Sequence, residues 1–95
     1  MTFSVTDSAA RFYKHEMDLK NGDCLRLFCR YAGSGAEGGF KLGVMADHPE
    51  DGDFIQQFNG INYFVRPGDQ WFIDQMKLDY DESNQDVICE LPSMV

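Results

Sequence analysis

A crowding of glycines divides the first half of the chain. Five of the nine glycines fall between Arg30 and Val44, in a stretch bounded by two runs of alternating residues. Glycine is favoured where the backbone needs a positive φ or where another group must approach it closely. The stretch therefore predicts a shaped loop between two strands, and not a generic linker.

The two runs beside the loop have the period of β-strands. Residues 25–31 and 40–47 each place apolar side chains at every second position, the two rows being Leu25, Leu27, Cys29 and Tyr31, then Phe40, Leu42, Val44 and Ala46. Alternation of this kind is typical of a strand that buries one face. We expect two antiparallel strands joined by the glycine loop.

A helix is expected before the first of these strands. Thr6 is a plausible N-cap after a short β-prone segment at 3–5, and Asp7 would meet the positive end of the helix dipole. Apolar residues then recur at helical spacing, and Asn21-Gly22 supplies a stop. The pattern predicts a helix over about residues 7–20.

The second half of the chain reads mainly as strands. Asn59-Gly60 between two β-prone runs, 54–58 and 61–65, predicts a tight hairpin, because both central residues of its turn need a positive φ. Asp69 can cap a short helix that carries Trp71 through Met76. Closing strands are expected at 78–80 and 87–91. The order predicts an α+β fold, a small mostly antiparallel or mixed β-sheet domain with one N-terminal helix and a short helix before the last strands.

The expected core follows from these elements. Large apolar side chains on the inward faces should be largely buried, and they are Phe12, Leu27, Leu42, Val44, Phe58, Val65, Trp71 and Phe72.

Length and charge limit the class of protein. With 95 residues the chain is expected to form a single domain, 1–95. A net charge of −8 disfavours nucleic acid and anionic membrane surfaces, which bind basic proteins. No apolar run approaches the length of a membrane span, and the N-terminus lacks a basic segment followed by an apolar one. These features predict a cytoplasmic protein.

Two groups of possible metal ligands are present, and neither has a metal-site spacing. Cys24, Cys29 and Cys89 contain no C-x-x-C pair, and the strand pattern gives Cys29 and Cys89 the positions of small core residues. The acidic connector, residues 47–53, does not have the spacing of a calcium loop. We expect this connector to face solvent and predict no metal site.

Several segments together resemble the HesB/IscA-like family, the A-type carriers of iron–sulfur cluster biogenesis. The similar segments are the opening 5–10, the strand at 25–27, the run Gly39 to Gly43, which resembles the family's G-F-x-x-G, the hairpin at 58–65, and Leu78-Asp79-Tyr80. The resemblance covers nearly the whole chain and implies the HesB-like fold.

The cluster ligands implied by the family are replaced here. Alignment on Gly38-Gly39-Phe40 places Glu37 where the family has its first cysteine, and Leu91 to Val95 stands where the family has Cys-Gly-Cys. Since thiolates hold iron–sulfur clusters, we expect no bound cofactor. The chain is then expected to be a diverged, non-enzymatic member, a partner-binding or accessory protein whose glycine loop binds a protein partner, a second copy of itself or a small molecule. The alternative is a metal-handling or iron-handling protein that uses carboxylates in place of the thiolates, with Cys24 as a further candidate ligand.

The glycine loop is the expected interaction site. It is longer than a connection between two paired strands requires, and glycines let a backbone approach a partner closely. We expect the loop to be mobile in the isolated protein. The residues of this candidate interaction loop are Tyr31, Gly33, Gly35, Glu37, Gly38, Gly39 and Phe40.

Overall fold

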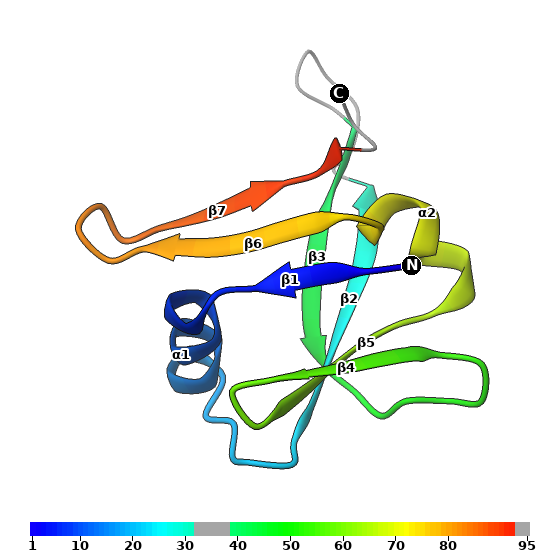
Figure 1. Ribbon diagram of the computed structural model, residues 1–95, viewed down its shortest axis with the longest axis horizontal. Helices are drawn as coiled ribbons and strands as arrows, with labels where there is room; N and C mark the ends of the chain where they lie inside the picture. Colours follow the sequence, from blue (N-terminus) through cyan, green and yellow to red (C-terminus); the bar gives the residue numbers. More distant parts are fainter. Residues whose placement is uncertain (32–38, 93–95) are drawn as a thin grey trace.

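Two mixed β-sheets form the frame of the molecule (Figure 1). The computed structural model describes residues 1–31 and 39–92. One sheet has the strand order β1-β6-β7, from β1 (Phe3–Val5), β6 (Met76–Asp81) and β7 (Asp86–Glu90). The other has the order β3-β2-β5-β4, from β3 (Phe40–Ala46), β2 (Cys24–Tyr31), β5 (Ile61–Val65) and β4 (Phe54–Phe58).

Each sheet combines neighbouring and distant parts of the chain. β2 pairs with β3 in antiparallel fashion from Leu25↔Ala46 to Tyr31↔Phe40, which confirms the two strands predicted around the glycine loop. β4 and β5 form the predicted hairpin, in which Asn59 and Gly60 have φ angles of 52° and 82°. The parallel pairs β1 with β6 and β2 with β5 then tie these local units together.

The helix α1 (Asp7–Glu16) packs on β6 and ends earlier than its sequence suggests. Thr6 is its N-cap, as predicted, and its hydroxyl accepts a hydrogen bond from the Ala9 amide. The predicted end near residue 20 is wrong. Asp18 adopts a φ of 53°, and the Leu19 amide donates to the Lys14 carbonyl, which closes a Schellman motif without glycine.

The second helical segment is also shorter than predicted. A 3₁₀ turn, η1 (Pro67–Asp69), leads into α2 (Gln70–Ile73), and Met76 already belongs to β6. Asp69 makes no capping hydrogen bond, contrary to expectation. No helix in residues 1–31 and 39–92 is long and apolar enough to cross a membrane.

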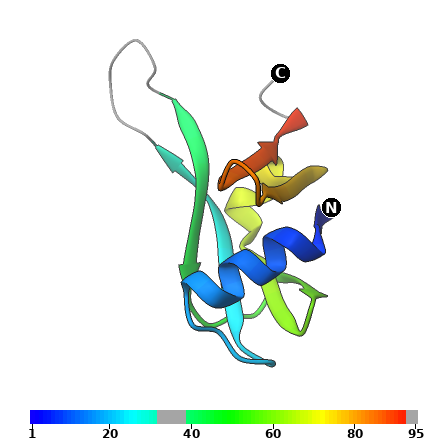
Figure 2. The ribbon, with the colours of Figure 1, turned by 90° about the vertical axis from the view of Figure 1, so that its left-hand side faces the viewer.

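The core lies between the two sheets and extends under both helices. Figure 2 shows β2 and β3 as one layer, with β6, β7 and α2 in a second layer. The buried apolar side chains come from both layers and are Phe3, Val5, Ala9, Ala10, Leu19, Leu25, Leu27, Ile61, Tyr63, Phe64, Val65, Phe72, Ile73, Met76 and Leu78.

The predicted core residues divide into three groups. Leu27, Val65 and Phe72 are fully buried, as predicted. Leu42, Val44 and Phe58 are half-buried and pack against the core. Phe12 is also half-buried, and its ring stacks on Tyr80. The prediction for Trp71 is wrong, because its side chain is 53% exposed while the next residue, Phe72, faces the core. Phe72 and Ile73 form the face of α2 that packs on the core, and Trp71, at the start of this short helix, points away from that face.

Candidate functional site: an exposed aromatic cluster

The inner faces of β2 and β3 continue beyond the edge of the core. The row of β2 begins with Leu25 and Leu27, which are buried, and ends with Tyr31, which is 65% exposed. Its partner across the strand pair is Phe40, which is 45% exposed. The inward-facing side chains of the strand pair are therefore buried in the core at one end, and at the other end they present two exposed aromatic rings.

Trp71 completes a chain of ring contacts at this end. The Tyr31 and Phe40 rings have centroids 5.9 Å apart, and the Phe40 and Trp71 rings have centroids 5.7 Å apart, both with an edge-to-face orientation. Trp71 also contacts the buried Phe72 ring, at 5.5 Å between centroids. We call Tyr31, Phe40 and Trp71 the aromatic cluster. It is an exposed surface that rests directly on the core.

The sequence predicted two members of this cluster. Tyr31 and Phe40 belong to the candidate interaction loop and lie in contact. Gly39, beside Phe40, has a φ of +148°, a backbone conformation that side-chain-bearing residues rarely adopt. Four predicted members lie outside the described residues: Gly33, Gly35, Glu37 and Gly38. The predicted mobility of the loop concerns the same residues and stays a prediction.

The sequence analysis did not identify Trp71 as a site residue, because it assigned this large apolar side chain to the core. Its ring is brought to Phe40 by the packing of α2 on β2, which joins segments 31 residues apart in sequence. The adjacent apolar residues Phe72 and Ile73, both fully buried, were the available signal, because they leave Trp71 no inward direction.

The cysteines do not form an iron–sulfur ligand set. Burial raises the pKa of Cys89 to about 11, so its thiol stays protonated at neutral pH. Partial burial and the nearby Asp69 carboxylate also raise the pKa of Cys29. Both side chains pack against the core, in keeping with the positions predicted for them.

Cys24 lies apart from these two, in a surface hollow of about 340 Å³ that it shares with Asp23, Asp47 and His48. Within residues 1–31 and 39–92, no group of three or more Cys, His, Asp or Glu side chains could hold a metal ion. The described donors therefore do not fit a cluster.

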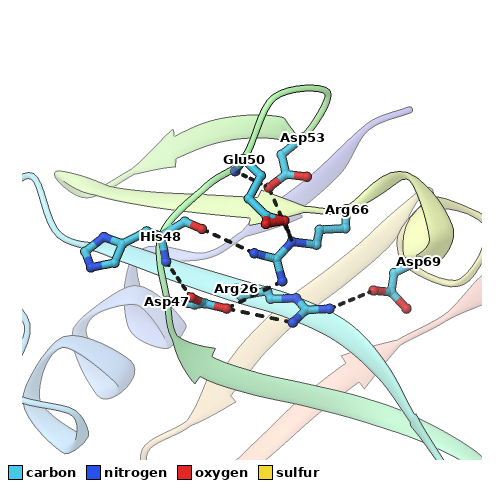
Figure 3. A network of polar contacts seen from close by, with 7 residues as sticks. All are labelled: Arg26, Asp47, His48, Glu50, Asp53, Arg66 and Asp69. Carbon is cyan, nitrogen blue, oxygen red and sulfur yellow. Dashed lines mark hydrogen bonds and ion pairs between the residues drawn. The ribbon is translucent and has the colours of Figure 1, made fainter.

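The prediction that the acidic connector faces solvent is right only in part: residues 48 and 50–52 are exposed, whereas Asp47 and Asp53 are not. Figure 3 shows its side chains gathered around Arg66. The Arg66 Nε atom lies 3.3 Å from Glu50 Oε1 and 3.7 Å from Asp53 Oδ2, and the Asp53 side chain is only 2% exposed. Arg66 also donates to the His48 carbonyl oxygen at 3.3 Å. The connector is thus fastened to the end of β5.

A second arginine extends this network toward the aromatic cluster. Asp47 Oδ2 lies 3.5 Å from Arg66 Nη1 and 3.8 Å from Arg26 Nη1 (Figure 3). Arg26 continues to Asp69, with 3.6 Å between Nη2 and Oδ2, and the Asp69 carboxylate accepts the Cys29 amide at 3.2 Å. Asp69, which was expected to cap α2, instead fixes η1 and α2 to β2. The network positions the helix that carries Trp71.

Known proteins match this chain along most of its length. A 93-residue alignment is 34% identical to a Bacillus subtilis (strain 168) protein named pyruvate dehydrogenase inhibitor, and it covers 95% of this chain and 98% of that protein. An uncharacterised protein of Staphylococcus aureus (strain USA300) is 31% identical over 78 residues, which are 78% of this chain and 80% of the relative.

Solved structures share the fold at low sequence identity. The crystal structure of IscA with a [2Fe-2S] cluster superposes with a TM-score of 0.72 at 13% identity, covering 96% of this chain and 86% of IscA. Escherichia coli SufA gives a TM-score of 0.64 at 20% identity, covering 97% and 80%. These likenesses show the fold alone, and they confirm the predicted HesB-like architecture.

The family model described as iron-sulphur cluster biosynthesis matches residues 1–92. Together with the relative that is 34% identical, this match confirms the resemblance inferred from the glycine run and the hairpin. The chain belongs to the iron-sulphur cluster biosynthesis family, the HesB/IscA-like proteins.

Proposed function

We propose that this chain is a non-catalytic regulator, acting as a single domain over residues 1–95, that binds a protein partner through the aromatic cluster. The candidate partner is pyruvate dehydrogenase. The observation that carries the proposal is the set of three exposed rings, Tyr31, Phe40 and Trp71, held in mutual contact at one end of the molecule.

The geometry of the cluster supports a protein partner. Tyr and Trp are enriched among the residues that dominate binding energy at protein interfaces. Here the rings are supported from below by the buried Phe72 and from the side by the arginine network. A surface whose side chains are already positioned loses less conformational entropy when it binds. Beside Trp71 lies a hollow of about 220 Å³, lined by Met1, Gln70 and Asp74, which could receive a side chain of the partner.

The relatives supply the candidate partner. A protein 34% identical to this chain, over almost the full length of both, is named a pyruvate dehydrogenase inhibitor. Members of one fold family often differ in function, so this name identifies the partner to test first.

No pKa shift among the described groups moves a side chain toward neutral pH, which is in keeping with a role without catalysis. A general acid or base works best with a pKa near the operating pH. Burial moves Tyr63 and Cys89 away from neutrality, to pKa values of about 12 and about 11. The pKa of Asp79 is lowered, mainly by the Thr6 hydroxyl and also by the Tyr80 amide, so this carboxylate is a weak base.

The test is the activity of purified pyruvate dehydrogenase from the organism of this chain, measured as this protein is titrated in. We expect wild type to inhibit, and Trp71→Ala to need at least about 30-fold more protein, the effect of losing a residue that contributes about 2 kcal/mol. Ile55→Ala is the matched control, because Ile55 is 49% exposed on the edge strand β4, away from the cluster. We expect this control to inhibit like wild type.

Two results would contradict the proposal. One is the absence of any binding or inhibition by wild type. The other is equal inhibition by wild type and Trp71→Ala when circular dichroism shows both to be folded. Sedimentation of the isolated protein tests the second expected occupant of the cluster, another copy of this chain, since self-association lost in Trp71→Ala would identify it.

Anaerobic reconstitution with iron and sulfide tests the metal-handling alternative. The described cysteines and carboxylates form no ligand group, so we expect no thiolate-to-iron charge-transfer bands in the visible spectrum. A stable brown protein with sulfide-dependent absorption would favour cluster handling over regulation.

A further inference from the structure

The outer face of the β2/β3 pair carries two basic side chains behind the aromatic cluster. Arg30 and Lys41 are direct partners across the two strands, one residue before the Tyr31↔Phe40 pair. Because side chains alternate between the faces of a sheet, Arg30 and Lys41 project on the side opposite Tyr31 and Phe40. Both are exposed.

This pair is unfavourable for the isolated fold. Directly opposed residues on antiparallel strands have Cβ atoms about 5 Å apart, and like charges there are destabilising. The chain has 16 acidic residues and only eight Lys and Arg residues, so neutralising partners are abundant. Instead, the two cations of this pair face one another.

The other arginines are all paired with carboxylates. Arg11 pairs with Glu82, Arg26 with Asp47 and Asp69, and Arg66 with three acidic residues of the connector. Arg30 is the one arginine without an ion pair to any residue in 1–31 or 39–92, and Lys41 has none there either. Local conflicts of this kind are expected where a surface serves function and not stability.

We infer that Arg30 and Lys41 form a second contact surface, which binds carboxylates of the same protein partner that receives the aromatic cluster. The inference rests on the proposed function. The end of the β2/β3 pair thus presents an aromatic face and a basic face to a partner cleft with an apolar wall and an acidic wall. A planar guanidinium can hold a carboxylate through two parallel hydrogen bonds, and the Lys41 ammonium adds a point charge.

The overall charge favours carboxylates over nucleic-acid phosphates. Nucleic-acid binders gain affinity by placing many cations along a polyanion, whereas this chain has a net charge of −8. Repulsion from that charge would oppose a long phosphate backbone. A small group of acidic side chains in an otherwise neutral or basic protein surface can meet two cations without that penalty.

The test compares two double variants with the same change in net charge. Arg30→Gln/Lys41→Gln removes the proposed contacts. The control, Arg11→Gln/Lys20→Gln, is called the α1 double variant and removes one cation of α1 and one from the segment after it. In Figure 1, α1 lies away from the glycine-loop end of β2 and β3. Binding of each variant to purified pyruvate dehydrogenase is measured by surface plasmon resonance at several salt concentrations. Thermal unfolding provides the folding control, and Arg30→Gln/Lys41→Gln should unfold at the same or a higher temperature than wild type.

We expect Arg30→Gln/Lys41→Gln to bind about tenfold more weakly, mainly through slower association, and to show a smaller salt dependence than wild type. The α1 double variant should match wild type. Equal affinity and salt dependence for Arg30→Gln/Lys41→Gln, with Trp71→Ala still impaired, would overturn this inference and leave the proposed function standing. No binding by wild type would overturn both. Tighter binding to a 20-nucleotide single strand than to pyruvate dehydrogenase, lost in the same variant, would overturn the carboxylate assignment in favour of phosphate.

Discussion

The hydroxyl of Tyr63 is a polar atom without a hydrogen-bond partner in the described core. The side chain is fully buried, its ring lies edge-to-face with Phe58 at 5.8 Å between centroids, and burial raises its pKa to about 12. A buried hydroxyl that loses its hydrogen bonds to water without replacing them destabilises a fold. The ring contributes apolar packing, and the oxygen opposes it.

Tyr63→Phe should therefore raise the free energy of unfolding, by up to about 1 kcal/mol. Urea unfolding followed by circular dichroism measures the change. Tyr13→Phe, at a half-buried tyrosine of α1, provides a comparison. A loss of 1 kcal/mol or more for Tyr63→Phe would mean that the hydroxyl is bonded in solution.

Gly43 is constrained by its neighbour across the strands. It is buried and pairs with Phe28, and a Cβ atom at Gly43 would overlap the Phe28 ring. The Arg26 guanidinium also lies over this ring, 5.2 Å from its centroid. We expect Gly43→Ala to displace the ring and to destabilise the protein by about 1–3 kcal/mol, as overpacking does.

Gly68→Ala is the matched control for Gly43→Ala, because a Cβ atom there meets nothing within 4 Å. Combining Gly43→Ala with Phe28→Ala should cost less than the sum of the two single changes. Strict additivity would show that the two residues do not compete for the same space.

At the scale of elements, one hydroxyl links α1 to β6. Thr6 Oγ1 donates to Asp79 Oδ1 at 2.6 Å while accepting the Ala9 amide of the first helical turn. These contacts, with the Tyr80 amide, lower the pKa of Asp79. A carboxylate whose pKa is lowered by folding stabilises the fold fully at pH values above the pKa of the unfolded state, which is about 3.9. That contribution is lost as the pH falls through the lowered pKa of the folded state.

Stability should therefore decline below about pH 4, and Asp79→Asn should flatten that decline. Thermal unfolding measured from neutral pH to about pH 2 gives the two slopes. Identical slopes for wild type and Asp79→Asn would show that this carboxylate does not couple protonation to folding.

The fastening of the acidic connector predicts an unequal effect of two arginine substitutions. Arg66→Met leaves Asp53 buried without its cation and should cost roughly 2 kcal/mol, less than a fully buried pair because Arg66 is 23% exposed. Arg11→Met breaks an exposed pair with Glu82 and should change stability by less than about 0.5 kcal/mol. Similar effects in a denaturant titration would show that the connector is not held by charge.

Most elements could be predicted from local patterns. Alternation predicted β2 and β3, and Asn59-Gly60 predicted the hairpin, because these signals depend on a few adjacent residues. The end of α1 could not be placed, because Asp18 takes the left-handed position that glycine usually fills. The parallel pairing of β1 with β6 joins residues more than 70 apart, and nothing in the local sequence encodes it.

The candidate site could be predicted only in part for the same reason. Tyr31 and Phe40 follow from the strand period and the glycine loop. Trp71 reaches them through the packing of α2, which depends on Arg26 and Asp69. The ion pairs of the acidic connector could not be predicted for the same reason. An acidic run alone indicates a solvated segment, and only the fold brings Arg26 and Arg66 to its carboxylates.

At the scale of the whole molecule, the chain has the fold of its family, and its described cysteines do not gather into a ligand set. The frame superposes on that of IscA with a TM-score of 0.72, while the described cysteines lie on strands and form no metal-binding group. In this chain the end of the β2/β3 pair presents aromatic rings on one face and two cations on the other. That end of the molecule is the surface that we propose binds a protein partner.

The most direct measurement follows Trp71 itself, which is the one tryptophan of the chain. Labelling with 5-fluorotryptophan gives a single ¹⁹F resonance from the aromatic cluster, observed as purified pyruvate dehydrogenase is added. We predict that the resonance shifts and broadens and that its sensitivity to H₂O/D₂O exchange falls, because binding removes the exposed ring from water. An unchanged resonance from protein that co-sediments with pyruvate dehydrogenase would contradict the assignment of the cluster as the docking surface.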